Sequence, residues 1–106
     1  MGRRGDKILR GGENVYPLEV EQVLTTHPGV QDVVVVGVPE RRLGETIKAF
    51  IVPTPGTTPD SADLRRYARE RLAGFKVSAM WQFLDAMPRN PNGKIMRRAL
   101  PTEAVD

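Results

Sequence analysis

The most constraining feature of this sequence is a run of β-branched residues near its middle. Residues 30–39 read VQDVVVVGVP, in which valine occupies most positions. Because β-branched side chains pack well on a pleated surface, this nearly continuous apolar run predicts a β-strand in a central position of a sheet. Residues 45–53, ETIKAFIVP, predict a second strand. The short charged connector between them allows an antiparallel return, with Gly44 at the bend.

Before these strands, the sequence indicates a hairpin and a helix. Residues 7–16 hold two short extended pieces separated by Gly11 and Gly12, a pair that suits a tight turn because glycine accepts positive φ. Pro17 follows and suits the first position of a helix, where a backbone N–H is not needed. That helix should end near His27, because a Pro-Gly pair comes next.

After the strands, Asp60 is expected to cap a second helix that ends at Gly74. Its predicted buried stripe consists of Leu64, Tyr67, Ala68 and Leu72. Residues 80–84 predict a short third strand, and residues 86–94 read as a loop with little to bury. The pattern predicts an α+β fold: a small sandwich of an antiparallel or mixed three-stranded sheet with helices on one face, plus an N-terminal β-hairpin.

The composition excludes several classes of protein. The chain has 106 residues, the size of one small domain, with no cysteine and a single histidine. Disulfides, thiolate metal sites, thiol nucleophiles and His-based triads are therefore ruled out within this sequence, and we expect no metal site. No apolar run is long enough to span a bilayer, and no secretion leader is visible. We therefore expect a cytoplasmic chain.

The basic residues gather in two short segments. The net charge is only +3, yet residues 1–10 and 89–98 together hold eight of the 16 lysines and arginines. Basic segments of this kind favour anionic ligands. Nucleic acid is not expected, because no aromatic residue is interleaved within the second segment.

Two segments carry candidate chemistry. Residues 88–94, PRNPNGK, end in Lys94 beside Gly93, where an ammonium group could enter a crowded site and neutralise charge on a phosphate or carboxylate. In residues 2–17, Arg3 could hold a phosphate or ribose, and the glycine pair would let the backbone approach a thin ligand. On spacing alone, a solvated loop lysine and an ordinary hairpin remain the simpler interpretations.

Other candidates are weaker. His27 at a helix end favours packing or dipole complementation over catalysis. Glu19 and Glu21 stand two residues apart on a helix and do not face each other, so paired acid–base work is not expected. Phe75 and Lys76 are expected to be exposed at a helix exit.

Taken together and in this order, the two candidate segments resemble a known family. GRRGDKILRGGENVYPLEVE is similar to the hinge-region motif of the adenylate-forming superfamily, and PRNPNGKIMRRAL is similar to its C-terminal lysine motif. The intervening HPGVQDVVVVGVPERRLGETIKAFIV and LAGFKV match the same pattern in order. That superfamily includes acyl-CoA synthetases, amino-acid adenylation domains and firefly-type luciferases. The segments GGENVYPLEVE and LAGFKV most resemble those of fatty-acyl and aryl CoA ligases.

The resemblance implies that residues 1–106 are one mobile C-terminal lid domain of a larger acyl-CoA synthetase. It divides the chain into hinge and hairpin over 1–16, core over 17–85, and catalytic lysine loop and tail over 86–106. The implied partner is the enzyme's own N-terminal domain, which would hold the carboxylic acid substrate and most of the ATP and Mg²⁺ site. The isolated chain is therefore expected to be inactive.

The implied reaction has two steps. A carboxylate attacks the α-phosphate of ATP to give acyl-AMP and pyrophosphate, and the thiol of CoA then gives the thioester. Lys94 matches the family's adenylation lysine. Arg3 matches the arginine that holds the AMP ribose, and Asn14 is placed near phosphate.

The resemblance also assigns residues to the second step and to the hinge. The predicted CoA contacts are Gly11, Gly12, Glu13, Phe75 and Lys76. Gly5 stands at the hinge position, followed by Asp6, where relatives commonly have Asp or Lys. The alternatives left open are an aryl-CoA ligase, an amino-acid adenylation domain and a stand-alone binding module. The PxxxxGK spacing resembles a lysine acyltransferase target, which makes such an enzyme a candidate partner at Lys94.

Overall fold

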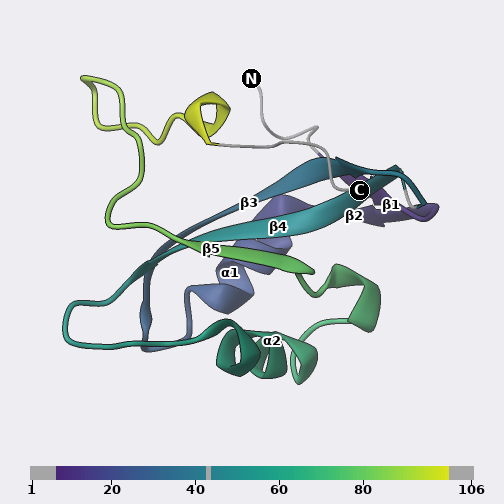
Figure 1. The fold of residues 1–106 in the computed structure, drawn as a ribbon, viewed down its shortest axis with the longest axis horizontal. Helices are drawn as coiled ribbons and strands as arrows, with labels where there is room; N and C mark the ends of the chain where they lie inside the picture. Colours follow the sequence, from purple (N-terminus) through teal and green to yellow (C-terminus); the bar gives the residue numbers. More distant parts are fainter. Residues whose placement is uncertain (1–6, 43, 101–106) are drawn as a thin grey trace.

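The computed structural model describes residues 7–42 and 44–100, and it is built on one five-stranded mixed sheet (Figure 1). The strand order is β2-β1-β4-β3, and β5 also pairs with β4. The strands are β1 (Ile8–Arg10), β2 (Glu13–Val15), β3 (Val30–Glu40), β4 (Gly44–Pro53) and β5 (Met80–Phe83). Strand β4 is antiparallel to β3 and β1 and parallel to β5. The α+β class and the mixed sheet are confirmed, and the hairpin belongs to the same sheet.

The helices begin where the local sequence predicts. Helix α1 (Pro17–Leu24) starts at the proline, and helix α2 (Ser61–Arg69) is capped by Asp60, whose Oδ1 accepts from the Asp63 N–H at 2.8 Å. Both helices end before the predicted points near His27 and Gly74. After α1, the threonine hydroxyls at 25 and 26 bond back to helix carbonyls and turn the chain. Two short 3₁₀ helices follow later, η2 (Gly74–Lys76) and η3 (Arg97–Ala99).

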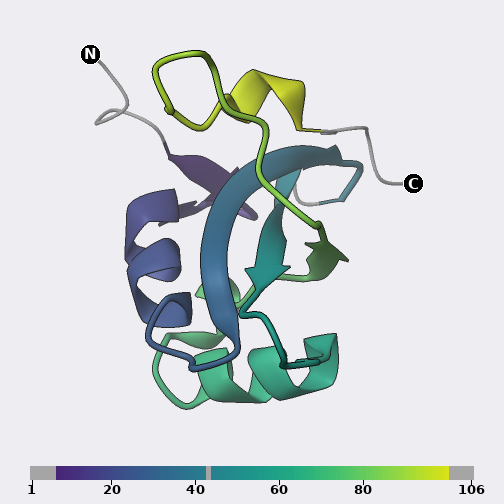
Figure 2. The same cartoon turned by 90° about the vertical axis from the view of Figure 1, so that its left-hand side faces the viewer.

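The two faces of the sheet bury different parts of the chain. The helices cover one face, in a cluster that includes Val20, Leu24, Val33, Val35, Ile47, Ala49, Ile51, Leu64 and Ala68. The other face carries Val34, Phe50 and Val52, and the C-terminal segment covers it with Met87 and Leu100. Figure 2 shows that segment, yellow-green to yellow, at the opposite end of the molecule from α2. The expectation that residues 86–94 have little to bury is therefore wrong at Met87, which is 5% exposed.

The prediction that the valine-rich strand is central is also wrong. Among the described residues, β3 pairs only with β4, which is the central strand. The valine run is apolar at consecutive positions because both faces of β3 are buried. Burial of the two faces does not determine whether a second strand pairs along each edge. At that edge, the Val35 N–H donates to Glu21 Oε2 at 2.8 Å, and the Val35 carbonyl accepts from Arg97 Nη1 at 3.2 Å.

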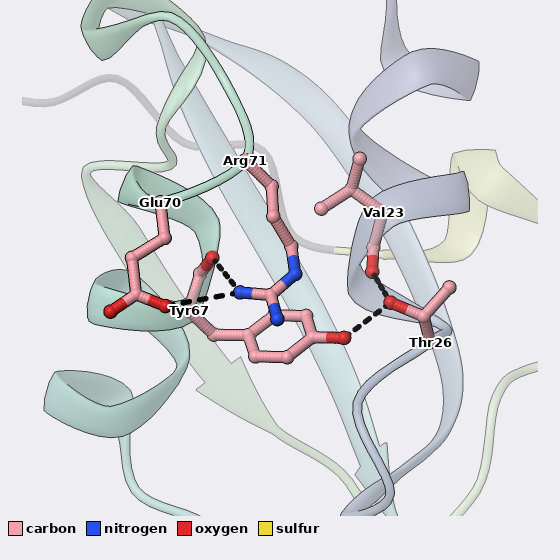
Figure 3. A network of polar contacts seen from close by, with 5 residues as sticks. All are labelled: Val23, Thr26, Tyr67, Glu70 and Arg71. Carbon is pink, nitrogen blue, oxygen red and sulfur yellow. Dashed lines mark hydrogen bonds and ion pairs between the residues drawn. The ribbon is translucent and has the colours of Figure 1, made fainter.

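The ends of α1 and α2 meet around Tyr67 (Figure 3). The Tyr67 hydroxyl shares a hydrogen bond with Thr26 Oγ1, and the Arg71 guanidinium lies 3.6 Å from the centre of the Tyr67 ring. The His27 ring meets Tyr67 edge-on at 4.9 Å between ring centres, and its Nδ1 accepts from the Gly29 N–H. His27 thus packs, as the sequence favours, while Tyr67 is only half-buried rather than part of a buried stripe.

Within residues 7–42 and 44–100, none of the helices is both long enough and apolar enough to cross a membrane. The same residues contain no group of three or more acidic or histidine side chains that could hold a metal ion.

Candidate functional site

Lys94 lies on the returning arm of a small closed hairpin, which we call the lysine hairpin (residues 89–95). Its two ends pair through an isolated bridge between Arg89 and Ile95. The Asn90 N–H donates to the Lys94 carbonyl at 2.9 Å, and Asn90 Oδ1 accepts from the Lys94 N–H at 3.0 Å. Gly93 completes the turn at φ +86°, a conformation that favours glycine. The backbone of Lys94 is thus held at both its donor and its acceptor, while its side chain is exposed.

A forked contact fastens the lysine hairpin to the sheet. Arg89 Nη1 donates to the Gly93 carbonyl at 2.9 Å, and Arg89 Nη2 donates to Asp32 Oδ2 on β3 at 3.0 Å. Neither Arg89 nor Asp32 was predicted as a site residue. Two features of the sequence could have pointed to them: Asp32 is an acid inside an apolar strand, and Arg89 belongs to the second basic segment.

The predicted CoA contacts begin at the turn between β1 and β2. Gly11 and Gly12 adopt φ +57° and +88°, as a two-residue hairpin of this handedness requires. No heavy atom of the described residues outside its chain neighbours lies within 4 Å of where a Cβ on Gly12 would stand, so the space beside it is open. Glu13 and Asn14 follow on β2, and both are exposed.

Phe75 and Lys76 come from η2, which lies against β2. The expectation that this pair is exposed is wrong, because both side chains are half-buried. Phe75 packs against the core cluster beneath the helices, since η2 folds back after α2. Lys76 Nζ donates to Glu19 Oε1 at 2.9 Å and to Oε2 at 3.0 Å, which gives this lysine a carboxylate partner on α1.

The structure therefore separates the predicted site residues into two groups. Figure 1 shows the lysine hairpin and the β1–β2 turn at opposite ends of the long axis of the molecule. Asn14, predicted to lie near phosphate, follows the glycine turn on β2. Arg3, Gly5 and Asp6 lie outside the described residues.

The chain matches the family model described as the AMP-binding enzyme C-terminal domain over residues 19–94. It is 53% identical over 95 residues to the fatty acid–[acyl-carrier-protein] ligase ScoC of Streptomyces coeruleorubidus, covering 90% of this chain and 18% of that protein. It is 48% identical over 100 residues to the 2-succinylbenzoate–CoA ligase of Geobacillus kaustophilus, covering 94% and 20%. Its fold matches the Mycobacterium tuberculosis fatty acyl CoA synthetase with a TM-score of 0.83 at 39% identity, covering 92% and 19%.

The chain therefore belongs to the AMP-binding enzyme C-terminal domain family, within the adenylate-forming enzymes, and the resemblance found from the motifs is confirmed. These relatives are acyl-CoA, aryl-CoA and acyl-carrier-protein ligases. The chain spans about a fifth of the length of the curated relatives it matches.

Proposed function

We propose that this chain is the mobile C-terminal domain of an ATP-dependent acyl-CoA synthetase, which converts a carboxylate, ATP and CoA into acyl-CoA, AMP and pyrophosphate. The observation that carries the proposal is the separation of two motifs on one family domain. The hairpin with the braced lysine lies at one end, and the open glycine turn, which leads into the strand that η2 contacts, lies at the other. A domain built this way can present a different end to one active site in each half-reaction.

In the adenylation step, a carboxylate oxygen attacks the α-phosphorus of ATP and pyrophosphate leaves with the electrons of the broken P–O bond. Negative charge is shared among the attacking and phosphoryl oxygens during this exchange. The exposed ammonium of Lys94 can reach these oxygens, and among the described residues no carboxylate is paired with it. An unneutralised cation at this point stabilises the transition state electrostatically.

In the thioester step, the thiol attacks the acyl carbonyl and AMP leaves. The pantetheine arm of CoA is thin, and the open space at Gly12 lets it pass close to the backbone. Glu13 borders this turn on β2, and η2 places Phe75 and Lys76 against the same strand. We assign Lys76 to the phosphates of the CoA nucleotide, with Phe75 as its support.

The remaining roles belong to other parts of the enzyme. Arg3 would hold the AMP ribose, with Asn14 near phosphate in one orientation, and Gly5 and Asp6 would form the hinge. The described residues offer no acidic cluster for Mg²⁺, so we assign that ion to the N-terminal domain and derive no step through it. The use of ATP and CoA favours a cytoplasmic enzyme.

A second thiol acceptor has specific support. The relative at 53% identity is named a fatty acid–[acyl-carrier-protein] ligase, and a carrier protein offers its thiol on a phosphopantetheine arm like that of CoA. The glycine turn serves either acceptor equally, whereas only CoA brings a nucleotide to Lys76. Comparing CoA with a loaded carrier protein as acceptor separates the two functions. The acid itself is not determined by this domain, because the relatives act on both fatty and aryl carboxylates.

The proposal is tested by measuring the half-reactions separately in the full-length enzyme. Lys94→Ala should reduce pyrophosphate release by about 10²–10³-fold, as removal of one electrostatic stabiliser does. Thioester formation from supplied acyl-AMP should be largely spared. Lys48→Ala, which removes a lysine of β4 outside both groups, is the control. Equal loss of both half-reactions in Lys94→Ala would contradict the division of roles between the two ends.

A further inference from the structure

A polar contact joins the lysine hairpin to the sheet through the side chain of Arg89. One arm of its guanidinium binds the Gly93 carbonyl, immediately before Lys94, and the other binds the Asp32 carboxylate on β3. A guanidinium is planar and presents its donors at fixed angles, so two partners on different arms are held in a fixed mutual direction. A lysine at position 89 has one nitrogen and could not reproduce this geometry.

Ile95, at the base of the hairpin, packs against the cluster around Val34 and Phe50, and the other hydrogen bonds of the hairpin act within it or at its base. Asn90 closes the turn on itself through the N–H groups of Asn92 and Lys94. At the base, the Met96 N–H donates to the Pro88 carbonyl at 2.7 Å. Neither set fixes the direction in which the tip points relative to the sheet. Among the hydrogen bonds of the described residues, only that from Arg89 to Asp32 ties residues 89–94 to a strand of the sheet.

We propose that Asp32 and Arg89 are positioning residues that aim Lys94 for adenylation. This inference rests on the adenylation role proposed above for Lys94. Asp32 lies on β3, at the irregularity in its pairing with β4 between Val30 and Asp32, and Arg89 links this strand to the backbone beside the lysine. Neither residue needs to touch a substrate. A misdirected hairpin would leave the ammonium of Lys94 present but out of place, which is costly because catalytic groups must be held closely to their productive geometry.

The ion pair is partly exposed, and this makes a positioning role separable from a structural one. The side chains of Arg89 and Asp32 are 44% and 32% exposed, and pairs of this kind contribute little to global stability. Removing either partner should therefore leave the unfolding midpoint almost unchanged while loosening the lysine hairpin. If the pair were merely structural, its removal would lower the unfolding midpoint and leave the hairpin no looser than the rest of the domain.

The test compares Arg89→Ala and Asp32→Ala with Arg66→Ala and Asp63→Ala in the full-length enzyme. The control pair is also Arg–Asp, at 2.9 Å, but lies on α2 away from the hairpin. For the first two variants, we expect pyrophosphate release to fall in kcat by roughly 10-fold or more, with little change in KM for ATP. Thioester formation from supplied acyl-AMP should be unchanged. Hydrogen exchange in the peptide covering residues 88–96 should speed up.

Two further variants sharpen the result. The double variant of Asp32 and Arg89 should be no slower than either single one, because the two residues act through one contact. Arg89→Lys should recover only part of the loss, since an ammonium lacks the planar fork that holds the two partners in a fixed mutual direction. The controls should change neither readout.

The outcomes distinguish this proposal from the function on which it rests. Unchanged kcat or unchanged exchange in Arg89→Ala, while Lys94→Ala abolishes pyrophosphate release, overturns the positioning role and leaves the adenylation role intact. If Lys94→Ala itself releases pyrophosphate at the normal rate, the adenylation role fails and the positioning role falls with it. A large loss of stability in Arg89→Ala, with both half-reactions reduced alike, also overturns the proposal.

Discussion

The guanidinium of Arg97 faces both carboxylate oxygens of Glu21, with Nη2 3.2 Å from Oε1 and 3.0 Å from Oε2. The same two side chains bind the backbone of Val35: Glu21 accepts from its N–H, and Arg97 donates to its carbonyl. The free edge of β3 is therefore bonded at this point to α1 and to the C-terminal segment. Edge strands otherwise present unpaired backbone groups to solvent. The pair also anchors the chain just beyond the lysine hairpin, because Arg97 follows it by two residues.

We expect Glu21→Gln to lower the free energy of unfolding by about 1–3 kcal/mol, measured by urea denaturation. The carboxamide offers one acceptor oxygen where the carboxylate offers two, and it leaves the half-buried Arg97 without a counter-charge. Glu19→Gln is the matched control on the same helix, where the carboxylate is 44% exposed and the loss should stay within about 0.5 kcal/mol. Equal losses in the two variants would show that the edge contact contributes no special stability.

Local chemistry explains which parts of the fold the sequence predicted. The start of α1 at Pro17, the cap at Asp60 and the turn at Gly11 and Gly12 depend on residues adjacent in the chain, and all three are confirmed. The edge position of β3 was not predictable from its valines. An apolar pattern reports which faces are buried and is silent on which edges are paired.

The candidate site shows the same division. Lys94 and the glycine turn are recognisable from a few neighbouring residues and their family motifs. The contacts that support them join residues far apart in sequence: Arg89 meets Asp32 across 57 positions, and Lys76 meets Glu19 across the same separation. Such pairs depend on strand order and helix packing, which a single sequence does not specify.

Gly12→Leu should block thioester formation and let acyl-AMP accumulate, because the side chain would occupy the open space beside the turn. The substitution also strains the backbone, since φ is +88°, and this alone costs about 1 kcal/mol. Gly56→Leu is a matched control: its φ is +83°, and its Cβ would also meet nothing within 4 Å among the described residues. Both variants should lose similar stability, and only the first should lose the thioester step. Normal thioester turnover in Gly12→Leu would show that the thiol arm does not pass beside this turn.

Replacing Glu19 and Lys76 should move the KM for CoA in opposite directions. Lys76→Ala removes a cation assigned to the CoA phosphates and should raise KM, whereas Glu19→Gln removes the carboxylate that neutralises that cation and should lower it. We expect about fivefold in each direction, which corresponds to about 1 kcal/mol for a partly exposed charge. The measurement is thioester formation from supplied acyl-AMP at varied CoA. A carrier protein as acceptor should show neither shift, and a rise in KM for CoA in both variants would contradict the assignment.

Acetylation of Lys94 should switch off the first half-reaction alone. The lysine side chain is exposed on the lysine hairpin, where a lysine acyltransferase could reach it. Acetylation replaces the ammonium with a neutral amide, which cannot stabilise charge on the α-phosphate, so pyrophosphate release should fall about as far as in Lys94→Ala. The hydrogen bonds between Asn90 and the backbone of Lys94 do not involve the modified nitrogen, so the hairpin itself should persist. Installing acetyl-lysine at position 94 of the full-length enzyme and assaying both half-reactions checks this. Thioester formation from supplied acyl-AMP should continue, and deacetylation should restore the first step; undiminished pyrophosphate release from the acetylated enzyme would refute the switch.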